Sequence, residues 1–163
     1  MKPPFTGLLR GFFGLLLLIT AVGKLLDNRG FAEILATYQF YIPEPLLLPL
    51  GLAISLGELG MALAIFAGVQ LPRMAQLTIL LHAGYTALAA LTNLRGLDLT
   101  NCGCFGVFWA RPMTWLTVAE DVVLTLMAIA FYAGVRPLAR ARPGNASREL
   151  DRSPGRGALE HHS

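Results

Sequence analysis

The chain has 163 residues, of which 55% are hydrophobic and only 14% are charged. Soluble domains carry about 25% charged residues, and a chain of this length has too little interior to bury so much apolar surface. A soluble enzyme, a disordered module and a small disulfide-rich secreted protein are therefore excluded. The formal net charge of +3 does not indicate a nucleic-acid partner, because residues 1–135 are balanced and the excess arginine lies in 136–163. The composition predicts an integral membrane protein.

Four segments are apolar over lengths close to the roughly 20 residues that a helix needs to cross a bilayer. They are residues 5–26, 46–71, 74–94 and 113–135. Prolines fall at or beside the proposed boundaries, where a missing N–H costs little. They are Pro43, Pro45, Pro72 and Pro112. The sequence predicts an all-α membrane protein whose residues 1–135 form one transmembrane domain, a four-helix bundle.

The distribution of lysine and arginine predicts the orientation of this bundle. Nine of the 13 basic residues fall on the side of the N-terminus, and four fall on the other side. We therefore expect a bacterial inner-membrane protein with both termini cytoplasmic and with segments 27–45 and 95–112 in the periplasm. An alternative for residues 5–26 is a signal peptide, since Ala21-Val22-Gly23 resembles a cleavage site. Either interpretation leaves the later helices in the same orientation.

The first periplasmic segment has the pattern of a short amphipathic helix. Phe31, Ile34, Leu35 and Tyr38 follow helical spacing, and Ile42 comes after them. Such a helix over residues 31–42 would lie along the outer surface, either as a packed cap or as a guide for a substrate.

The segment 136–163 is rich in Arg, Pro and Gly and has no apolar periodicity. This composition predicts a disordered cytoplasmic tail that contacts anionic lipid.

Small residues recur at four-residue spacing on the first two predicted spans. They are Gly7 and Gly11 on one span, and Gly60, Ala64 and Gly68 on the next. This spacing predicts positions at which helix backbones approach closely in lipid.

The chain's two cysteines lie one residue apart in the run Asn101-Cys102-Gly103-Cys104-Phe105-Gly106. The predicted location is the second periplasmic segment, where disulfides form and persist. Gly103 and Gly106 permit the backbone angles that a very small ring demands. A disulfide across one residue closes almost no loop, so it would add little to the stability of the fold. The strain in so small a ring also makes the bond easier to reduce. The pattern favours a redox-active pair, and the spacing leaves open which cysteine attacks.

Two other hypotheses fit the same thiols. In one, the pair binds a soft ion such as Cu(I) or Hg(II) and the bundle is a transporter or metallochaperone, although no further Cys and no Met cluster accompany it. In the other, the protein is a non-catalytic membrane assembly factor and the cysteines are a local structural element. No dedicated metal site is predicted.

Ionisable residues inside the predicted spans are the remaining candidates for chemistry. Glu58 lies near the centre of the second span, and we expect either a proton-relay role or a buried ion pair with Arg10. His82, near the middle of the third span, is either a packing residue or a proton carrier. Glu120 and Asp121 lie close to the thiol loop, where one carboxylate could accept a thiol proton or simply be solvated.

Several of these features together resemble the MauE branch of the DoxX-like membrane proteins over about residues 8–130. The matching positions are Arg10, Gly14, Gly23-Lys24-Leu25, Tyr38, Pro43, Glu58, Gly60, Arg95-Gly96 and Cys102-Gly103-Cys104-Phe105-Gly106. The resemblance implies a four-helix inner-membrane protein associated with redox work. MauE itself belongs to methylamine utilisation, where it is thought to help form the disulfides of the methylamine dehydrogenase small subunit beside a thioredoxin-like partner.

From the residues and this resemblance we expect Cys102 and Cys104 to exchange electrons with a periplasmic thioredoxin-like protein, or to support disulfide maturation of an exported enzyme. Gly103, Phe105 and Gly106 would support the loop. Whether the protein is itself a thiol–disulfide oxidoreductase stays open. The residues indicate no cofactor, and a quinone acceptor rests only on analogy with other four-helix membrane oxidoreductases.

Overall fold

The computed structural model describes residues 3–140, which form five α-helices. The helices are α1 (Pro3–Leu26), α2 (Asn28–Thr37), α3 (Glu44–Ala67), α4 (Leu71–Leu94) and α5 (Trp115–Arg140). α1, α3, α4 and α5 are each long and apolar enough to cross a membrane. The prediction of an all-α, four-helix membrane protein is therefore confirmed.

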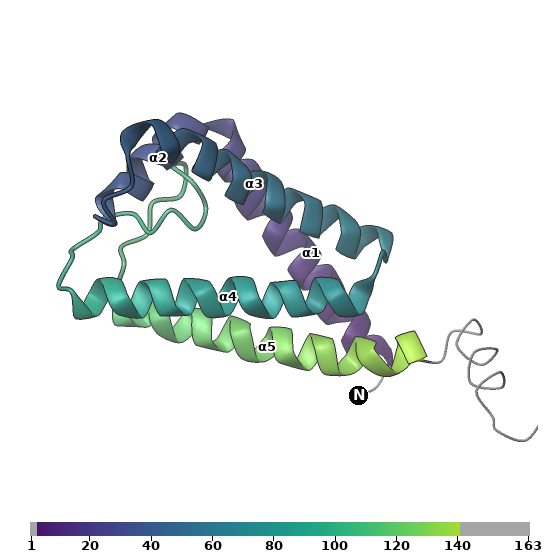
Figure 1. Cartoon of the computed structure of the whole chain (residues 1–163). Coiled ribbons are helices and arrows are strands. Elements are labelled where there is room, and N and C mark those ends of the chain that lie inside the picture. Colours follow the sequence, from purple (N-terminus) through teal and green to yellow (C-terminus); the bar gives the residue numbers. More distant parts are fainter. Residues whose placement is uncertain (1–2, 141–163) are drawn as a thin grey trace, which may run out of the picture.

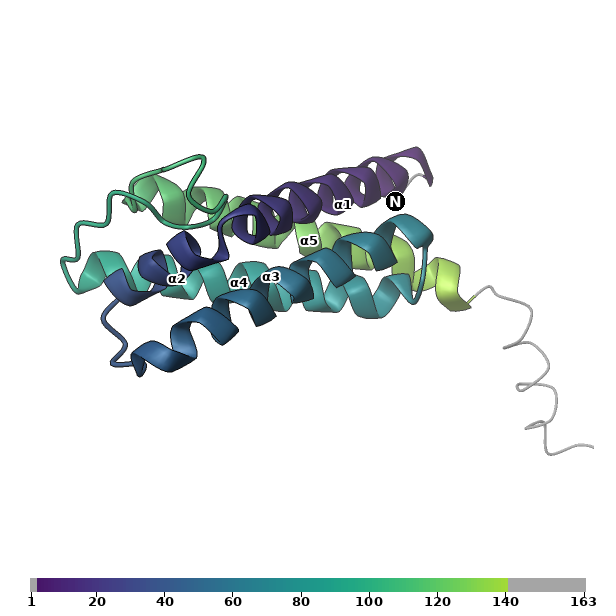
Figure 2. The ribbon, with the colours of Figure 1, turned by 90° about the horizontal axis from the view of Figure 1, so that it is seen from above.

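The four long helices form two closely packed pairs. α4 runs along α5, and α1 packs against α3 (Figure 1). Contacts of α1 with α5 and of α3 with α4 join the pairs into a bundle. The short helix α2 and the loop between α4 and α5 gather at one end, whereas the start of α1 and the end of α5 lie at the other (Figures 1 and 2). The loop that carries the cysteines is therefore far from the two ends of the described chain.

Prolines and one glycine set the ends of the central helices. α3 and α4 each have a proline in the first turn, Pro45 and Pro72, where no intrahelical N–H bond is lost. α3 ends at Gly68, whose φ of 73° is left-handed. The membrane-length part of α5 ends at Arg136, close to the expected 135, and the helix itself continues to Arg140. The rest of the expected tail, 141–163, lies outside the described residues.

The predicted amphipathic helix exists, but its limits differ from 31–42. α2 begins earlier because the Asp27 side chain accepts a hydrogen bond from the Gly30 N–H over 2.8 Å. It ends at Thr37, and Gln39 and Tyr41 then adopt left-handed φ values of 55°, so Ile42 lies outside the helix. The apolar face of α2 packs on α3 with Phe31 buried. The helix is therefore a packed cap on one end of the bundle.

Large side chains fill the interior of the bundle and also cover its outside. Phe13, Ile65 and Phe131 are fully buried in the core. Other large apolar residues project outward, among them Leu80 and Leu126 with 70% and 60% of their surfaces exposed. A soluble protein would not expose so much contiguous apolar surface, whereas lipid tails accommodate it. The high apolar content thus reflects a lipid-facing surface as well as a core.

Of the predicted small-residue contacts, Gly68 does meet α1, since a Cβ atom there would lie 3.2 Å from the Arg10 guanidinium, but the other glycines of the set do not. A Cβ atom at Gly7, Gly11 or Gly60 would have no neighbour within 4 Å, so these positions do not mediate close helix approach. The close approach between α1 and α3 occurs at Gly14, where a Cβ would lie 2.9 Å from the Phe66 ring. Four-residue spacing alone did not locate the contact, because it does not say which side of a lipid-embedded helix faces its neighbour.

Candidate functional site: a paired thiol beneath α2

The two cysteines lie in a tightly folded part of the loop between α4 and α5. The Asn101 side chain accepts the Gly103 N–H over 2.9 Å and donates to the Gly106 carbonyl over 3.2 Å. Gly103 and Gly106 have left-handed φ values of 72° and 71°, which other residues adopt only at a cost. The Cys102 N–H donates to the Arg111 carbonyl over 2.8 Å. These bonds fix the backbone on which both sulfurs are carried.

The loop brings the two sulfurs together as free thiols. The Sγ atoms of Cys102 and Cys104 are 2.8 Å apart, and the Cys104 N–H points at the Cys102 sulfur over 3.5 Å. Cys102 is buried and Cys104 is half-buried. Among residues 3–140 no group of three or more His, Cys, Asp or Glu is arranged to hold a metal ion.

The thiols have different affinities for protons. Hydrogen bonding from the Cys104 thiol lowers the pKa of Cys102 to about 7 despite burial, and the Cys104 N–H and the Arg111 charge act in the same direction. The same hydrogen bond and burial raise the pKa of Cys104, and the charge of Asp121 adds to this. Because the thiolate is the nucleophile in disulfide chemistry, the asymmetry makes Cys102 the more reactive sulfur.

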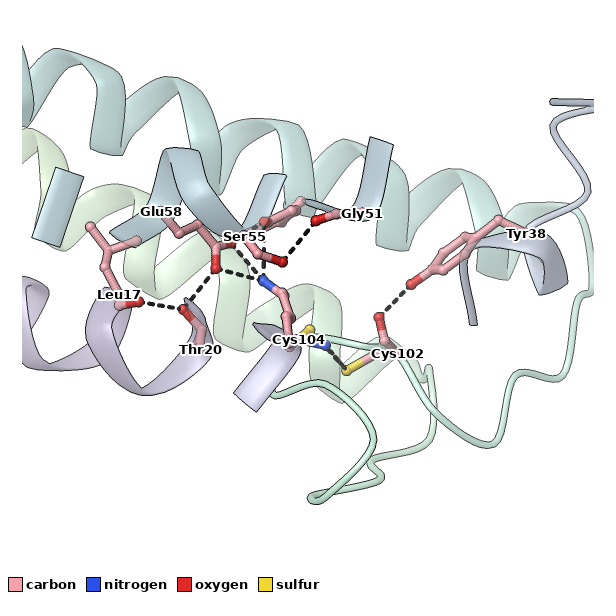
Figure 3. A network of polar contacts seen from close by, with 10 residues as sticks. Leu17, Thr20, Tyr38, Gly51, Ser55, Glu58, Cys102 and Cys104 are labelled. Atoms are coloured by element: carbon pink, nitrogen blue, oxygen red, sulfur yellow. Dashed lines mark hydrogen bonds and ion pairs between the residues drawn. The ribbon is translucent and has the colours of Figure 1, made fainter. Parts of the chain in front are cut away.

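The cap helix α2 covers the loop directly. A Cβ atom at Gly103 would lie 3.0 Å from Ile34 and 3.1 Å from Phe31, so only glycine fits without displacing α2. The Tyr38 hydroxyl, just after α2, donates to the Cys102 carbonyl over 2.7 Å (Figure 3). Arg95 in turn donates to the Tyr38 carbonyl over 2.9 Å. The helix and the thiol loop are thus fastened to each other.

The loop also rests on the backbone of α1 at Gly23. A Cβ atom at Gly23 would lie 2.5 Å from the Phe105 carbonyl oxygen, and one at Gly106 would overlap the Gly23 carbonyl. Neither backbone can withdraw cheaply, because both belong to packed elements. Gly23 therefore sets the distance between α1 and the thiol loop.

This contact predicts that Gly23→Ala destabilises the protein, while Gly11→Ala on the same helix does not. A side chain at Gly23 must push the Phe105 backbone away, a kind of overpacking that costs about 1–3 kcal/mol. At Gly11 a methyl group meets nothing within 4 Å, so the higher helix propensity of alanine should be neutral or stabilise by up to about 1 kcal/mol. The measurement is the free energy of unfolding in mixed detergent micelles. Equal stabilities would contradict the contact between α1 and the loop.

A buried polar network lies deeper in the bundle, next to the thiols. The Lys24 ammonium group contacts both Glu58 carboxylate oxygens, at 2.6 and 2.7 Å, with each side chain only 2% exposed. Thr20 donates to the same carboxylate over 3.0 Å, and the Tyr85 hydroxyl donates to it as well (Figure 3). The Glu58 charge is therefore compensated and hydrogen-bonded inside the apolar bundle, as a buried ion pair requires.

The expected pair between Glu58 and Arg10 is wrong. Arg10 instead donates to the Ile65 and Phe66 carbonyls, over 2.8 and 2.6 Å, at the end of α3 where carbonyls lack helical partners. α1 and α3 are antiparallel, and Glu58 precedes Phe66 by about 12 Å of helix. This places Glu58 at the level of Thr20 and Lys24 rather than Arg10.

His82 is buried among aromatic side chains. Its Nδ1 lies 2.9 Å from the Thr78 carbonyl oxygen, one turn back along α4. Its ring packs edge-on against Phe13, with ring centres 5.5 Å apart. These contacts are those of a packing residue, and a role as proton carrier remains untested.

Two cavities, of about 70 and 80 Å³, adjoin the thiol pair. The first lies beneath α2 and is lined by both cysteines together with Lys24 and Tyr38. The second lies within the bundle and is lined by Glu58, His82, Arg111 and Glu120 among others. Cys104, Tyr85 and Asp121 line both cavities. Cys104 therefore lies between the cap side and the bundle side of the site.

Sequence reasoning missed several members of this site. The sequence assigned no role to Lys24, Thr20 or Tyr85. Lys24 did lie in the run Gly23-Lys24-Leu25 that carries the family resemblance, which was the available signal. No pattern in the sequence indicated Thr20 or Tyr85, because a lone hydroxyl in an apolar helix has no distinctive spacing.

These features define a four-helix membrane protein with a pair of free thiols held beneath a cap helix at one end of the bundle. The chain belongs to the MauE family: the family model described as "Methylamine utilisation protein MauE" matches residues 2–134. The chain is 26% identical over 135 residues to the methylamine utilization protein MauE of Paracoccus denitrificans. The aligned region covers 83% of this chain and 72% of that protein. No solved structure matches the chain.

Proposed function

We propose that this protein is an inner-membrane thiol–disulfide exchange protein that acts on a periplasmic thioredoxin-like partner, or on an exported enzyme whose disulfides it helps to form. Membership of the MauE family supports a role of the methylamine-utilisation type. The observation that carries the proposal is the pair itself: the chain's two cysteines lie 2.8 Å apart, and one of them has a pKa lowered to about 7.

The proposed reaction is an exchange of one disulfide for another. The Cys102 thiolate attacks a disulfide of the partner, forms a mixed disulfide and releases the first partner thiolate. Cys104 then attacks the Cys102 sulfur and releases the second partner thiolate, leaving a Cys102–Cys104 disulfide. The partner gains the two electrons that the pair loses, and the reverse sequence reduces the pair.

The distribution of basic residues along the sequence supports the proposed orientation of the bundle. In sequence, nine of the 13 basic residues belong to the segments on the side of the N-terminus and four to the segments 24–45 and 95–112, which supports a cytoplasmic location for the N-terminal side. The thiol loop and α2 then face the periplasm. Because Cys102 is buried beneath α2, we infer that a docked partner displaces α2 before exchange.

The proposal predicts that a protein too large to cross the membrane controls the redox state of the pair from outside. Intact spheroplasts are incubated with purified thioredoxin in its reduced form, or with a strongly oxidising thioredoxin-like protein in its oxidised form. Free thiols are then alkylated with a maleimide that adds a large mass, after denaturation in acid. We expect the reduced thioredoxin to give a doubly alkylated protein and the oxidising protein to give an unalkylated one.

A variant with both cysteines changed to serine controls for nonspecific alkylation. Exchange that appears only after membrane disruption would contradict the periplasmic location but not the chemistry. A pair that keeps one redox state with both the reducing and the oxidising protein, before and after disruption, would contradict the exchange function itself. Protection from alkylation by Cu(I) in the folded protein before denaturation, with no response to either protein, would favour metal binding.

A further inference from the structure

Asp121, in the second turn of α5, is a buried residue with a carboxylate that takes no part in the exchange steps described above. Its side chain is only 8% exposed, and it lines both cavities together with Cys104. Its neighbour in sequence, Glu120, lines only the bundle-side cavity and forms an ion pair with Arg111 over 2.7 Å. Of the two carboxylates near the thiol loop, Asp121 is therefore the one that shares both cavities with Cys104.

Most other ionisable groups around the cavities already have partners. On the bundle side, Lys24 and Tyr85 are both bound to Glu58, and the Nδ1 of His82 contacts the Thr78 carbonyl, which leaves its Nε2 as an acceptor. On the cap side, the Tyr38 hydroxyl donates to the Cys102 carbonyl, and burial raises the pKa of this phenol far above its usual value.

Asp121 differs from the paired groups. Among the residues that the structure describes, no hydrogen bond or ion pair engages its carboxylate. Its oxygens are not among the fully enclosed, unpaired side-chain atoms of the described residues, so they face the open space of the cavities. Besides the thiols, Asp121 and the Nε2 of His82 are left to exchange a proton, and of these two Asp121 is the one that lines both cavities with Cys104.

We propose that Asp121 is the proton acceptor for the Cys104 thiol in the second step of exchange, an inference that rests on the proposed function. The Cys104 S–H proton passes to the Asp121 carboxylate as the Cys104 sulfur forms its bond to Cys102. The bond between Cys102 and the partner sulfur breaks, and its electron pair leaves with the partner thiolate. In the reverse direction the carboxylic acid returns the proton to Cys104.

Electrostatics gives a reason for this arrangement. The negative charge of Asp121 opposes a second thiolate next to Cys102 and contributes to the raised pKa of Cys104. When the Asp121 carboxylate accepts the proton, its negative charge is neutralised. The repulsion between Asp121 and the Cys104 sulfur is therefore removed while that sulfur attacks Cys102 as a thiolate. The same group thus keeps Cys104 protonated at rest and assists its ionisation during attack.

The test uses the purified, reduced protein and glutathione disulfide as the probe. Attack by Cys102 gives a protein–glutathione mixed disulfide, and attack by Cys104 converts it into the intramolecular disulfide; both are quantified by mass spectrometry after acid quenching. We expect Asp121→Asn to slow the second step at pH 7 by about 10²–10⁴-fold, the usual contribution of a positioned acid or base. The mixed disulfide should accumulate. The difference in rate between the variant and the wild type should become smaller as the pH rises, because hydroxide replaces the missing proton acceptor.

Three comparisons make the result specific. Asp121→Glu keeps a carboxylate and should recover most of the rate, while Glu33→Gln removes an exposed charge from α2 and should change nothing. In a Cys104→Ser background, Asp121→Asn should leave the first step at the same rate or faster, because the Asp121 charge raises the pKa of Cys102.

The outcomes separate this inference from the proposed function. The assignment of Asp121 would be overturned if Asp121→Asn carried out the second step at the wild-type rate at pH 7. It would also be overturned if the loss of rate in this variant were the same at every pH. A well-folded Asp121→Glu protein that is as slow as Asp121→Asn would overturn it as well. A wild-type protein that forms neither the mixed nor the intramolecular disulfide would instead contradict the exchange function.

Discussion

Cys104→Ser should accumulate a mixed disulfide through Cys102, whereas Cys102→Ser should react slowly and trap little. A thiol with a pKa of about 7 is about half ionised at pH 7, whereas an ordinary thiol of pKa about 8.5 is about 3% ionised. A serine hydroxyl at position 104 can still donate to the Cys102 sulfur and keep its pKa low. In Cys102→Ser, burial and the charge of Asp121 continue to hold the pKa of Cys104 high. We therefore expect at least a tenfold difference in alkylation rate at pH 7.

The measurements are the rate of reaction with iodoacetamide and the yield of the glutathione adduct, both by mass spectrometry. The rate for Cys104→Ser should rise as the pH increases from 6 to 8, because the thiolate fraction of Cys102 increases through its pKa, and should level off above that range. A variant with both cysteines changed to serine gives the background. Faster trapping by Cys102→Ser would reverse the roles of the two sulfurs.

Lys24→Met should destabilise the protein by about 3–5 kcal/mol. The change removes the partner of Glu58 and leaves an uncompensated carboxylate in the bundle, because Thr20 and Tyr85 are neutral groups. Lys24→Met combined with Glu58→Leu should recover most of the lost stability, since apolar residues of similar size can replace a buried ion pair. The free energy of unfolding in mixed dodecyl sulfate micelles measures both effects.

The ion pair between Arg111 and Glu120 provides a matched control within the same protein. Its side chains are 35% and 40% exposed, so Glu120→Gln should cost only about 0–1 kcal/mol. Equal effects of Lys24→Met and Glu120→Gln would contradict the buried network. Glu58→Gln tests the remaining hypothesis for Glu58: a stable variant that exchanges disulfides poorly would indicate that Glu58 also relays protons.

The sequence by itself determined the parts of the molecule whose cause is local. Long apolar segments form the four spanning helices because a bilayer demands that length, and Pro45 and Pro72 begin two of them because the first turn tolerates a missing N–H. The spacing of Phe31 and its apolar neighbours indicated a helix that proved to be the cap. The sequence also indicated the thiol pair and the left-handed turns at Gly103 and Gly106, because these too depend only on neighbouring residues.

Only the tertiary structure decided which side chains meet. The apolar residues of α3 and α4 are spread almost evenly around each helix, because lipid accepts them on one side and the bundle on the other. No periodicity therefore reveals the inward face or the register between antiparallel helices. Glu58 meets Lys24 rather than Arg10 because of that register.

The same reason applies at the thiol loop. Glu120 and Asp121 are adjacent and chemically alike, but successive residues on a helix point about 100° apart. Glu120 therefore pairs with Arg111 and lines one cavity, whereas Asp121 lines both cavities with Cys104. Close backbone approach falls at Gly23 rather than Gly11 because the loop folds back onto that turn of α1. The residue types were visible in the sequence, whereas their partners depend on how the helices are rotated and aligned against one another.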